Sequence, residues 1–220
     1  MSRAGRRLEY AAVAVVVLSL LTGCAGASGA QRGRSNPAGV EISGLSDDSA
    51  YRGAELPEPY RMPNITLTAD NGQPFNLVGD TAHPVTLVFF GYTNCPDECP
   101  LVLSELASVY QKLPAAVRAK TQVLFVTTDP ARDSDEVLRT YLSRFNPSFV
   151  GLRGSLPDII AAGKAMGVAI TGKHRLPGGG YDVGHSSQVI GFRGDRAPVI
   201  WTQGTPVRDI VSDILELAGP

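Results

Sequence analysis

The sequence predicts an α/β domain in which a central mixed β-sheet is flanked by helices and preceded by a β-hairpin. Three observations favour this class. Continuous apolar runs at residues 85–90 and 123–126 have the form of strands that are buried on both faces. Each run is followed by a segment whose apolar residues recur with helical spacing. Two further strand-like segments and a last helical segment then close the chain.

The first elements of the domain are a hairpin, a strand and a helix. Residues 65–68 and 74–77 alternate apolar with polar side chains around a turn at 70–72, which predicts the β-hairpin. The buried strand at 85–90 then leads through a cysteine-bearing turn into a helix. The apolar residues of that helix keep helical spacing over residues 103–113.

A second strand and helix repeat this arrangement. The strand at 123–126 is followed by a helix whose apolar face covers residues 137–145. Asp133 is the predicted N-cap of this helix, because Glu136 follows three residues later as in a capping box. A short strand is expected at 149–152.

The remaining elements reverse the direction of the chain. A helix begins after the predicted cap Ser155, and a short extended segment follows at 168–170. Residues 188–192 and 199–201 predict an antiparallel strand pair, and Pro206 opens the last helix. A parallel βαβ half, an antiparallel pair and a final helix together form the thioredoxin-type layout.

The composition limits the classes of function. The chain has 220 residues, of which 43% are hydrophobic, and a formal net charge of −1. This apolar fraction argues against disorder, and the balanced charge provides no basic surface for nucleic acid. Three cysteines are too few for a disulfide scaffold, and their odd number indicates that they do not share one role. We therefore expect a folded domain that does not bind nucleic acid.

The N-terminal segment has the three-part form of a secretory signal. Three arginines within the first seven residues supply a positive end, and residues 11–21 form an apolar run that is short for a bilayer span. The run ends in Leu-Thr-Gly before Cys24, which resembles the lipobox of bacterial lipoproteins. This resemblance implies that residues 1–23 are removed and that Cys24 carries a lipid. An ordinary signal peptide or a short anchor is the alternative.

Three segments of the chain are therefore expected. Residues 1–23 are the lipoprotein signal peptide, residues 24–58 are a flexible tether rich in small residues and proline, and residues 59–220 are the domain. Without residues 1–23 the chain keeps 17 basic and 20 acidic residues, a net charge of −3. The lipid anchor would place the domain on the extracytoplasmic face of the bacterial cell membrane, where thiols meet oxidants.

Cys95 and Cys99 form the most chemically specific pair in the domain. They lie between the strand at 85–90 and the next helix, and their spacing puts both sulfurs on one side of the first helical turn. Free backbone N–H groups and the helix dipole favour thiolate over thiol there. Such a pair suits Cu(I), Zn(II) or reversible disulfide chemistry, and a structural disulfide is the remaining alternative.

A third metal ligand is expected, because two thiolates alone leave Cu(II) undercoordinated. Of the three histidines, His83 and His174 lie in polar loops and are expected to be solvated. His185 stands directly before the strand at 188–192, whose entrance faces the cysteine turn in a thioredoxin-type layout. His185 is therefore the predicted third ligand, and a loop histidine bonded to backbone is the alternative.

Three segments together resemble the Sco/SenC family: residues 95–100 (CPDECP), residues 128–133 (TDPARD) and residues 185–186 (HS). The resemblance runs from about residue 60 to the C-terminus. It implies a membrane-tethered copper protein with a thioredoxin-like fold, which helps to assemble the binuclear copper centre of cytochrome c oxidase. It also implies that Cu(I) or Cu(II) is held by Cys95, Cys99 and His185.

Four carboxylates are candidates to surround these ligands, namely Asp97, Asp129, Asp133 and Asp182. Two positions depart from the family pattern. Asn94 stands where the family often has His, and Gly184 stands where it usually has Asp, so Asp182 is a candidate substitute. The glycines at 178–180 lead to the hypothesis that a loop swings His185 onto the metal and that copper binding orders residues 173–185.

Two functions fit this predicted site. The first is a copper chaperone, whose partner is the copper-bearing subunit of cytochrome c oxidase or another copper carrier. The second is a thiol–disulfide oxidoreductase that keeps the cysteines of the partner's copper site reduced. A peroxiredoxin is disfavoured, because Cys99 is too close to Cys95 to act as a usual resolving cysteine.

Overall fold

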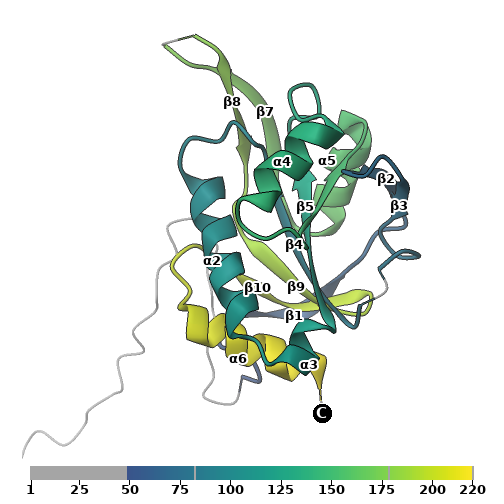
Figure 1. Ribbon diagram of the computed structural model, residues 1–220, viewed down its shortest axis with the longest axis vertical. Coiled ribbons are helices and arrows are strands. Elements are labelled where there is room, and N and C mark those ends of the chain that lie inside the picture. Colours follow the sequence, from purple (N-terminus) through teal and green to yellow (C-terminus); the bar gives the residue numbers. More distant parts are fainter. Residues whose placement is uncertain (1–48, 82, 178, 220) are drawn as a thin grey trace, which may run out of the picture. The chain divides into compact units, whose positions relative to one another are not determined.

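A mixed eight-stranded sheet forms the centre of the domain. The structure is a computed structural model, which describes residues 49–81, 83–177 and 179–219. The sheet has the strand order β1-β10-β9-β4-β5-β6-β2-β3 (Figure 1), and β7 and β8 form a separate two-stranded sheet. The strands are β1 (Ala54–Arg61), β2 (Thr66–Ala69), β3 (Pro74–Asn76), β4 (Val85–Gly91), β5 (Thr121–Thr127), β6 (Val150–Arg153), β7 (Ile170–Arg175), β8 (Tyr181–His185), β9 (Val189–Arg193) and β10 (Arg196–Trp201).

Strand β4 lies in the middle of this sheet. It pairs in parallel with β5 and antiparallel with β9, and all seven of its residues are buried. Phe89 belongs to a core cluster on one face of the sheet, and its neighbour Phe90 belongs to the cluster on the other face. Because successive strand residues point to opposite faces, a strand covered on both faces is mostly apolar, and in β4 Thr86 is the polar residue.

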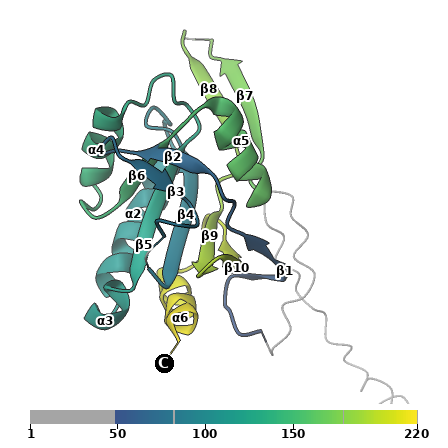
Figure 2. The ribbon, with the colours of Figure 1, turned by 90° about the vertical axis from the view of Figure 1, so that its right-hand side faces the viewer.

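Helices cover both faces of the sheet. Helices α2 (Glu98–Lys112), α4 (Asp135–Ser143) and α6 (Val207–Ala218) pack in the cluster on one face, and α5 (Leu156–Ala165) packs on the other (Figure 2). The four-residue helix α3 (Ala115–Arg118) connects α2 to β5. The predicted thioredoxin-like class, with a mixed sheet flanked by helices, is confirmed. The predicted N-terminal hairpin is β2–β3, in which Leu67 lies opposite Phe75.

The domain begins earlier in the chain than the sequence predicts. Strand β1 pairs antiparallel with β10, although it carries Pro57 and Pro59. Just before it, the N–H groups of Arg52 and Gly53 donate to the buried carboxylate of Asp213 in α6, at 2.6 and 2.8 Å. The expected boundary between tether and domain at residue 58 is therefore wrong. Residues 1–48, which include Cys24 and the expected signal peptide, lie outside the described residues.

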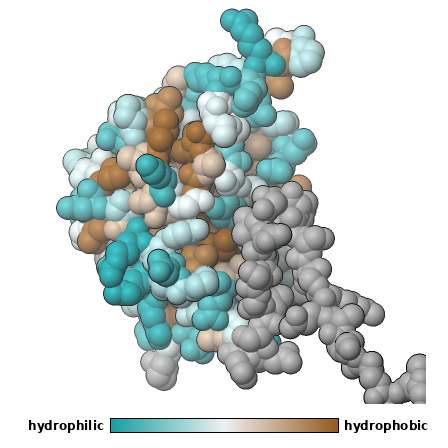
Figure 3. Space-filling model, turned by 180° about the vertical axis from the view of Figure 1, so that it is seen from behind, coloured by the Kyte–Doolittle hydropathy of each residue, from teal (hydrophilic) through white to brown (hydrophobic). Residues whose placement is uncertain are grey.

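The β7–β8 hairpin occupies a region that the sequence predicts as a short extended segment and a loop. Its two strands pair antiparallel, with His174 opposite Asp182. Among the residues of these two strands, Val183 is the buried one. Figure 3 shows the hairpin projecting at the top of the molecule with a mostly hydrophilic surface. The hairpin is therefore a β-structure that has almost no core of its own.

The helix ends show where local chemistry was predicted correctly. Ser155 caps α5 as expected, because its side chain accepts a hydrogen bond from the N–H of Asp158. The cap of α4 is Ser134 and not Asp133, since the Ser134 hydroxyl accepts from the N–H of Val137. Among the helices that the structure describes, none combines the length and apolar character needed to cross a membrane.

Candidate metal centre

The two cysteines lie where β4 passes into α2. Cys95 is half-buried in the turn, Cys99 is fully buried in the first turn of the helix, and both are free thiols. The cysteine turn is packed closely against the core: a Cβ added to Gly91 would lie 2.8 Å from the Phe125 ring and 2.9 Å from the Cys99 sulfur. Glycine at position 91 therefore leaves the space that Cys99 occupies.

The pKa values of the two thiols are shifted in opposite directions. A hydrogen bond from Cys99 and the backbone N–H groups of residues 97–99 lower the pKa of Cys95 to about 5, against the opposing effect of partial burial. The N–H of Cys99 lies 3.4 Å from the Cys95 sulfur. Donation to Cys95 and burial both raise the pKa of Cys99 far above its ordinary range. Cys95 is therefore the thiolate of the pair at neutral pH, and Cys99 is the proton donor.

His185 lies at the end of β8 and faces the cysteines, as the sequence predicts. Its Nε2 atom is 3.9 Å from the Cys99 sulfur, and its Nδ1 atom is 3.0 Å from the carbonyl oxygen of Ser186. A carbonyl oxygen only accepts hydrogen bonds, so Nδ1 is the protonated nitrogen in the neutral ring. The Nε2 lone pair is then directed toward Cys99, in the tautomer that a metal at this point would require.

Cys99 lies between the other two candidate ligands, but the three are not yet arranged around a common point. Cys99 contacts Cys95 through its backbone N–H and His185 through its sulfur. Across residues 49–81, 83–177 and 179–219, no three His, Cys, Asp or Glu side chains are grouped tightly enough to form a ready metal site. Of the other two histidines, His83 is half-buried, with its Nδ1 atom 3.2 Å from the Ala119 carbonyl oxygen, and His174 is exposed. The soft thiolate and the free imidazole nitrogen suit copper, but small movements must bring the three ligands together.

Asp133 holds the cysteine turn in place. Its carboxylate is completely buried and accepts hydrogen bonds from the Thr93 N–H at 3.1 Å, from the Thr93 hydroxyl at 2.6 Å and from the Thr127 hydroxyl at 2.5 Å. These bonds join the turn between β5 and α4 to the residue that lies two positions before Cys95. The alternative role expected for Asp133, as a helix cap, is taken by Ser134.

Asp129 lies in the same turn, but its carboxylate contacts the β7–β8 hairpin that carries His185, which we call the histidine hairpin. Its buried carboxylate forms an ion pair with the Arg132 guanidinium and accepts a 2.9 Å hydrogen bond from the Tyr181 hydroxyl. Asp182, the next residue in β8, accepts a hydrogen bond from the Tyr92 hydroxyl. The structure thus brings Asp129, Asp133 and Asp182 to the region of the site.

Asp97 is not brought into this network. It is exposed, it precedes the first residue of α2, and its side chain makes no capping hydrogen bond. The sequence reasoning also missed Tyr92 and Arg132, which contact the hairpin, and Tyr181, the hairpin residue that Arg132 contacts. Arg132 lies inside the TDPARD segment and Tyr92 lies directly after β4. For Arg132 the motif itself was the available signal, and for Tyr92 it was the position between β4 and Cys95.

A family model described as SCO1/SenC matches residues 57–218, which is well over half of the chain. The chain belongs to the SCO1/SenC family. Its structure resembles that of apo Sco1 from Thermus thermophilus, with a TM-score of 0.67 and 33% identity over 76% of this chain and 96% of that one. It also resembles yeast Sco1 with copper bound, with a TM-score of 0.64 and 31% identity over 72% of this chain and 88% of that one.

Curated relatives match shorter parts of the SCO1/SenC chain. A Stutzerimonas stutzeri protein named for copper binding is 36% identical over 61% of this chain and 65% of its own length. The mitochondrial protein SCO1 of Saccharomyces cerevisiae is 41% identical over 60% of this chain and 46% of its own length. The chain therefore spans between about half and two thirds of these relatives.

The structure gives a reason for the glycine by which this chain departs from the SCO1/SenC pattern. Gly184 lies opposite Gly172 in the hairpin, and a Cβ added to it would lie 2.2 Å from the Thr171 hydroxyl. A larger side chain at position 184 therefore requires the exposed side chain of Thr171 to turn away. The other departure, Asn94, is exposed, and its amide lies 3.4 Å from the Thr93 hydroxyl.

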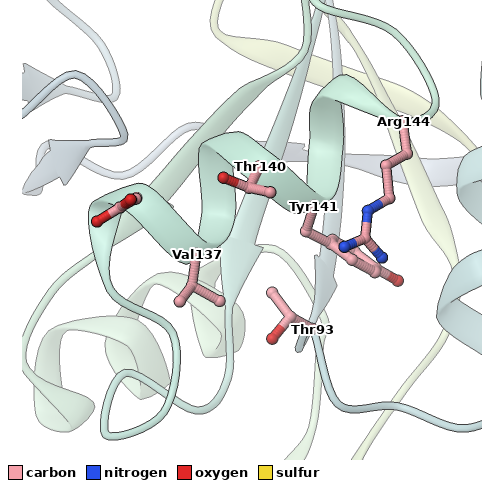
Figure 4. Close-up of a pocket in the computed structure, with 6 residues that line it drawn as sticks. Thr93, Val137, Thr140, Tyr141 and Arg144 are labelled. Carbon is pink, nitrogen blue, oxygen red and sulfur yellow. The ribbon is translucent and has the colours of Figure 1, made fainter.

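A hollow of about 320 Å³ lies beside the cysteine turn of this family member. Figure 4 shows Thr93 opposite Val137, with Tyr141 beside Arg144 at one end. Its lining residues come from the turn and from helix α4 with its C-cap, namely Thr93, Glu136, Val137, Thr140, Tyr141 and Arg144. Its lining combines polar and apolar side chains, and neither Cys95 nor Cys99 is among them.

Proposed function

We propose that this SCO1/SenC protein binds copper on Cys95, Cys99 and His185. The observation that carries the proposal is the 3.9 Å approach of the His185 Nε2 atom to the Cys99 sulfur, next to a Cys95 thiol whose pKa is about 5. Thiolates suit Cu(I), and addition of the imidazole suits Cu(II). Copper-bound yeast Sco1, at 31% identity, supports copper as the metal.

The metal is cargo in this proposal. Copper would leave by ligand exchange, in which thiolates of a partner replace Cys95 and Cys99 one at a time. The partner is the copper-bearing subunit of cytochrome c oxidase or another copper carrier, and the product is the binuclear copper centre of the oxidase. The protein would work on the extracytoplasmic face of the bacterial membrane, held by a lipid on Cys24.

Copper titration of the purified, reduced protein tests this proposal. We expect one equivalent of Cu(II) to bind and to produce a thiolate-to-copper charge-transfer band. Cys95→Ser and Cys99→Ser should abolish the band, because each removes one sulfur ligand. His185→Ala should shift the band and weaken Cu(II) at least about tenfold, with a smaller effect on Cu(I).

His174→Ala is the matched control for the histidine variant. His174 lies on the neighbouring strand of the same hairpin and is exposed. Its removal should leave the affinity for Cu(II) unchanged. Equal affinities in His185→Ala and the unaltered protein would show that His185 is not a ligand, and a reduced protein that binds no copper would overturn the proposed function.

A second function, thiol–disulfide oxidoreductase, is favoured by the unequal acidities of the two thiols. The Cys95 thiolate would attack a partner's disulfide, form a mixed disulfide and release one partner thiolate. Cys99 would then lose its proton and attack the Cys95 sulfur, which releases the second partner thiol and leaves Cys95 and Cys99 oxidised. Reduction of a partner disulfide by His185→Ala at the unaltered rate would support this function, whereas inactivity of the unaltered protein would exclude it.

A further inference from the structure

The hairpin that carries His185 has little apolar contact to hold it in position. In β7 and β8, Val183 is the buried residue and the others are half-buried or exposed. Ile170, which pairs with His185, packs against one core cluster, and the other contacts that position the hairpin are polar or aromatic. Most of these contacts lie on the first residues of β8, at Tyr181 and Asp182, and β7 adds an ion pair between Lys173 and Asp129 at 3.8 Å.

Arg132 makes the most extensive of these contacts. The guanidinium carbon lies 3.7 Å from the centroid of the Tyr181 ring, and Nη1 donates to the Tyr181 carbonyl oxygen at 3.2 Å. The Nε atom of the same group donates to Asp129, which also accepts from the Tyr181 hydroxyl. Arg132 and Asp129 thus hold both the ring and the backbone of Tyr181.

Arg132 is also close to the ring that contacts the imidazole. Its guanidinium carbon is 5.6 Å from the centroid of Tyr92. The Tyr92 hydroxyl donates to Asp182, and the Tyr92 ring meets the His185 ring edge-on at a centroid distance of 5.9 Å. Arg132 therefore touches the hairpin at the start of β8 and lies near the aromatic contact at its end.

We propose that Arg132 is a positioning residue for His185. By stacking on Tyr181 and bonding to its carbonyl oxygen, it fixes the direction of β8, and this direction places the Nε2 atom of His185 against the Cys99 sulfur. Tyr181 and His185 are the first and last residues of one five-residue strand, so a tilt at Tyr181 displaces the imidazole. The role of His185 as a copper ligand rests on the proposed function, but its placement in the metal-free protein does not.

An arginine is needed for this role because of its shape. The planar guanidinium stacks on the ring while two different nitrogens donate in its plane, to Asp129 and to the Tyr181 carbonyl oxygen. A lysine at this position would keep the charge and the ion pair with buried Asp129. It would lose the flat stacking surface and the second, simultaneous hydrogen bond. Arg132→Lys therefore removes the contacts that position Tyr181 while it keeps the positive charge beside Asp129.

The first test uses the reduced, metal-free protein and amide hydrogen exchange measured by NMR. In Arg132→Lys, we expect exchange of residues 181–186 to accelerate about tenfold, with β4 unchanged. Arg153→Lys is the matched control, because Arg153 forms a similar ion pair with Asp135 on α4. Unchanged exchange in Arg132→Lys, or equal acceleration in both variants, would overturn the proposal.

The second test is a double-mutant cycle read out by Cu(II) titration. Arg132→Lys should weaken Cu(II) binding about tenfold or more in the unaltered protein, as loss of a group that orients a ligand does. The same substitution in a His185→Ala background should change the affinity less than about twofold, because the residue that it positions is absent. Equal weakening in both backgrounds would mean a general structural role and would overturn the proposal.

The two tests also separate this proposal from the proposed function. If the unaltered protein bound no copper, the proposed function would fail. The hydrogen-exchange comparison would still decide whether Arg132 positions the hairpin, since it requires no metal. Accelerated exchange together with a background-dependent loss of Cu(II) affinity supports both.

Discussion

The cysteine turn and the histidine hairpin supply the same candidate site but are held in different ways. The cysteine turn follows a central strand with seven buried residues and is bonded to the buried carboxylate of Asp133. The hairpin contributes one buried residue and is attached by Arg132, Asp129 and Tyr92. Two of the three proposed ligands are thus fixed by the core, and the third is held by polar and aromatic contacts and by the packing of Ile170.

This difference suits the proposed function, in which the protein both holds and releases copper. In the proposed function, a cysteine pair fixed by the core accepts Cu(I) when Cys99 gives up its proton. A third ligand on a weakly attached hairpin can be added or withdrawn at a small cost in free energy, because few contacts are lost when it moves. Each of the following predictions would break or sharpen this contrast.

The largest effect is expected in amide hydrogen exchange of the reduced protein. Amides of β4 should exchange only when the whole domain unfolds, whereas those of β8 should exchange by local opening. We expect the β4 amides to be at least about a thousandfold slower, given the usual global stability of such domains. Comparable rates in the two strands would remove the contrast. NMR exchange measurements on both strands provide the check.

The two cysteines should also differ in reactivity toward iodoacetamide. At pH 7 Cys95, with a pKa of about 5, is almost entirely thiolate, and buried Cys99 remains a thiol. Alkylation of Cys95 should therefore be at least about a hundredfold faster, as measured by mass spectrometry of the two sites. Its rate should fall as the pH is lowered through about 5, rather than through the ordinary value of 9.0.

Variants of Cys99 test the cause of this pKa. Cys99→Ala removes the main hydrogen bond to Cys95 and should move the pH midpoint of alkylation upward, whereas Cys99→Ser keeps a donor and should move it less. A midpoint near 9 in the unaltered protein would contradict the assignment.

The lowered pKa of Cys95 also makes stability depend on pH. Because folding lowers this pKa, the ionised Cys95 stabilises the reduced fold fully above pH 9.0, and this contribution is lost as the pH falls through about 5.

Removal of the carboxylate that holds the cysteine turn should have the next largest effect. Asp133→Ala leaves donors of Thr93 and Thr127 without their acceptor in a buried position. We expect the free energy of unfolding to fall by about 3 kcal/mol, measured by urea denaturation of the reduced protein. Asp97→Ala is the control, since that carboxylate is exposed and its loss should change stability by less than about 0.5 kcal/mol.

A smaller effect is expected from Gly184→Ala in the hairpin. The added Cβ would collide with the Thr171 hydroxyl on the neighbouring strand and weaken the pairing of β7 with β8. Exchange of the β8 amides should rise several-fold, which corresponds to about 1 kcal/mol, with the urea midpoint unchanged. Thr171→Ala should restore slow exchange in the double variant. A lower urea midpoint would show that the hairpin is part of the global core.

The elements with a strong apolar pattern were predicted from the sequence. The run at residues 85–90 predicts a strand that is covered on both faces, and all residues of β4 are buried. Because a thioredoxin-type topology fixes which ends of the elements meet, His185 could be placed near Cys99 from its position before β9, and the structure puts them 3.9 Å apart. The topology of the fold was therefore more informative about the position of His185 than any single motif was.

The elements without such a pattern were missed. Strand β1 lies at the edge of the sheet and carries Pro57 and Pro59, which break the alternation of a strand. The β7–β8 hairpin is polar, with Val183 as its buried residue, so it has no periodic signal. Asp133 precedes the true cap Ser134 by one residue, and sequence spacing alone does not separate a cap from a buried acceptor.

The turn at residues 128–133 has a consequence for protein engineering. Its Thr128 N–H donates to the Gly91 carbonyl oxygen at 2.6 Å, Asp133 holds the cysteine turn, and Asp129 with Arg132 holds the hairpin. A designer who grafts only two cysteines and a histidine onto another scaffold would leave behind the part that sets their spacing. A graft that preserves this spacing would need three segments: the cysteine turn, the turn at residues 128–133 and the β7–β8 hairpin.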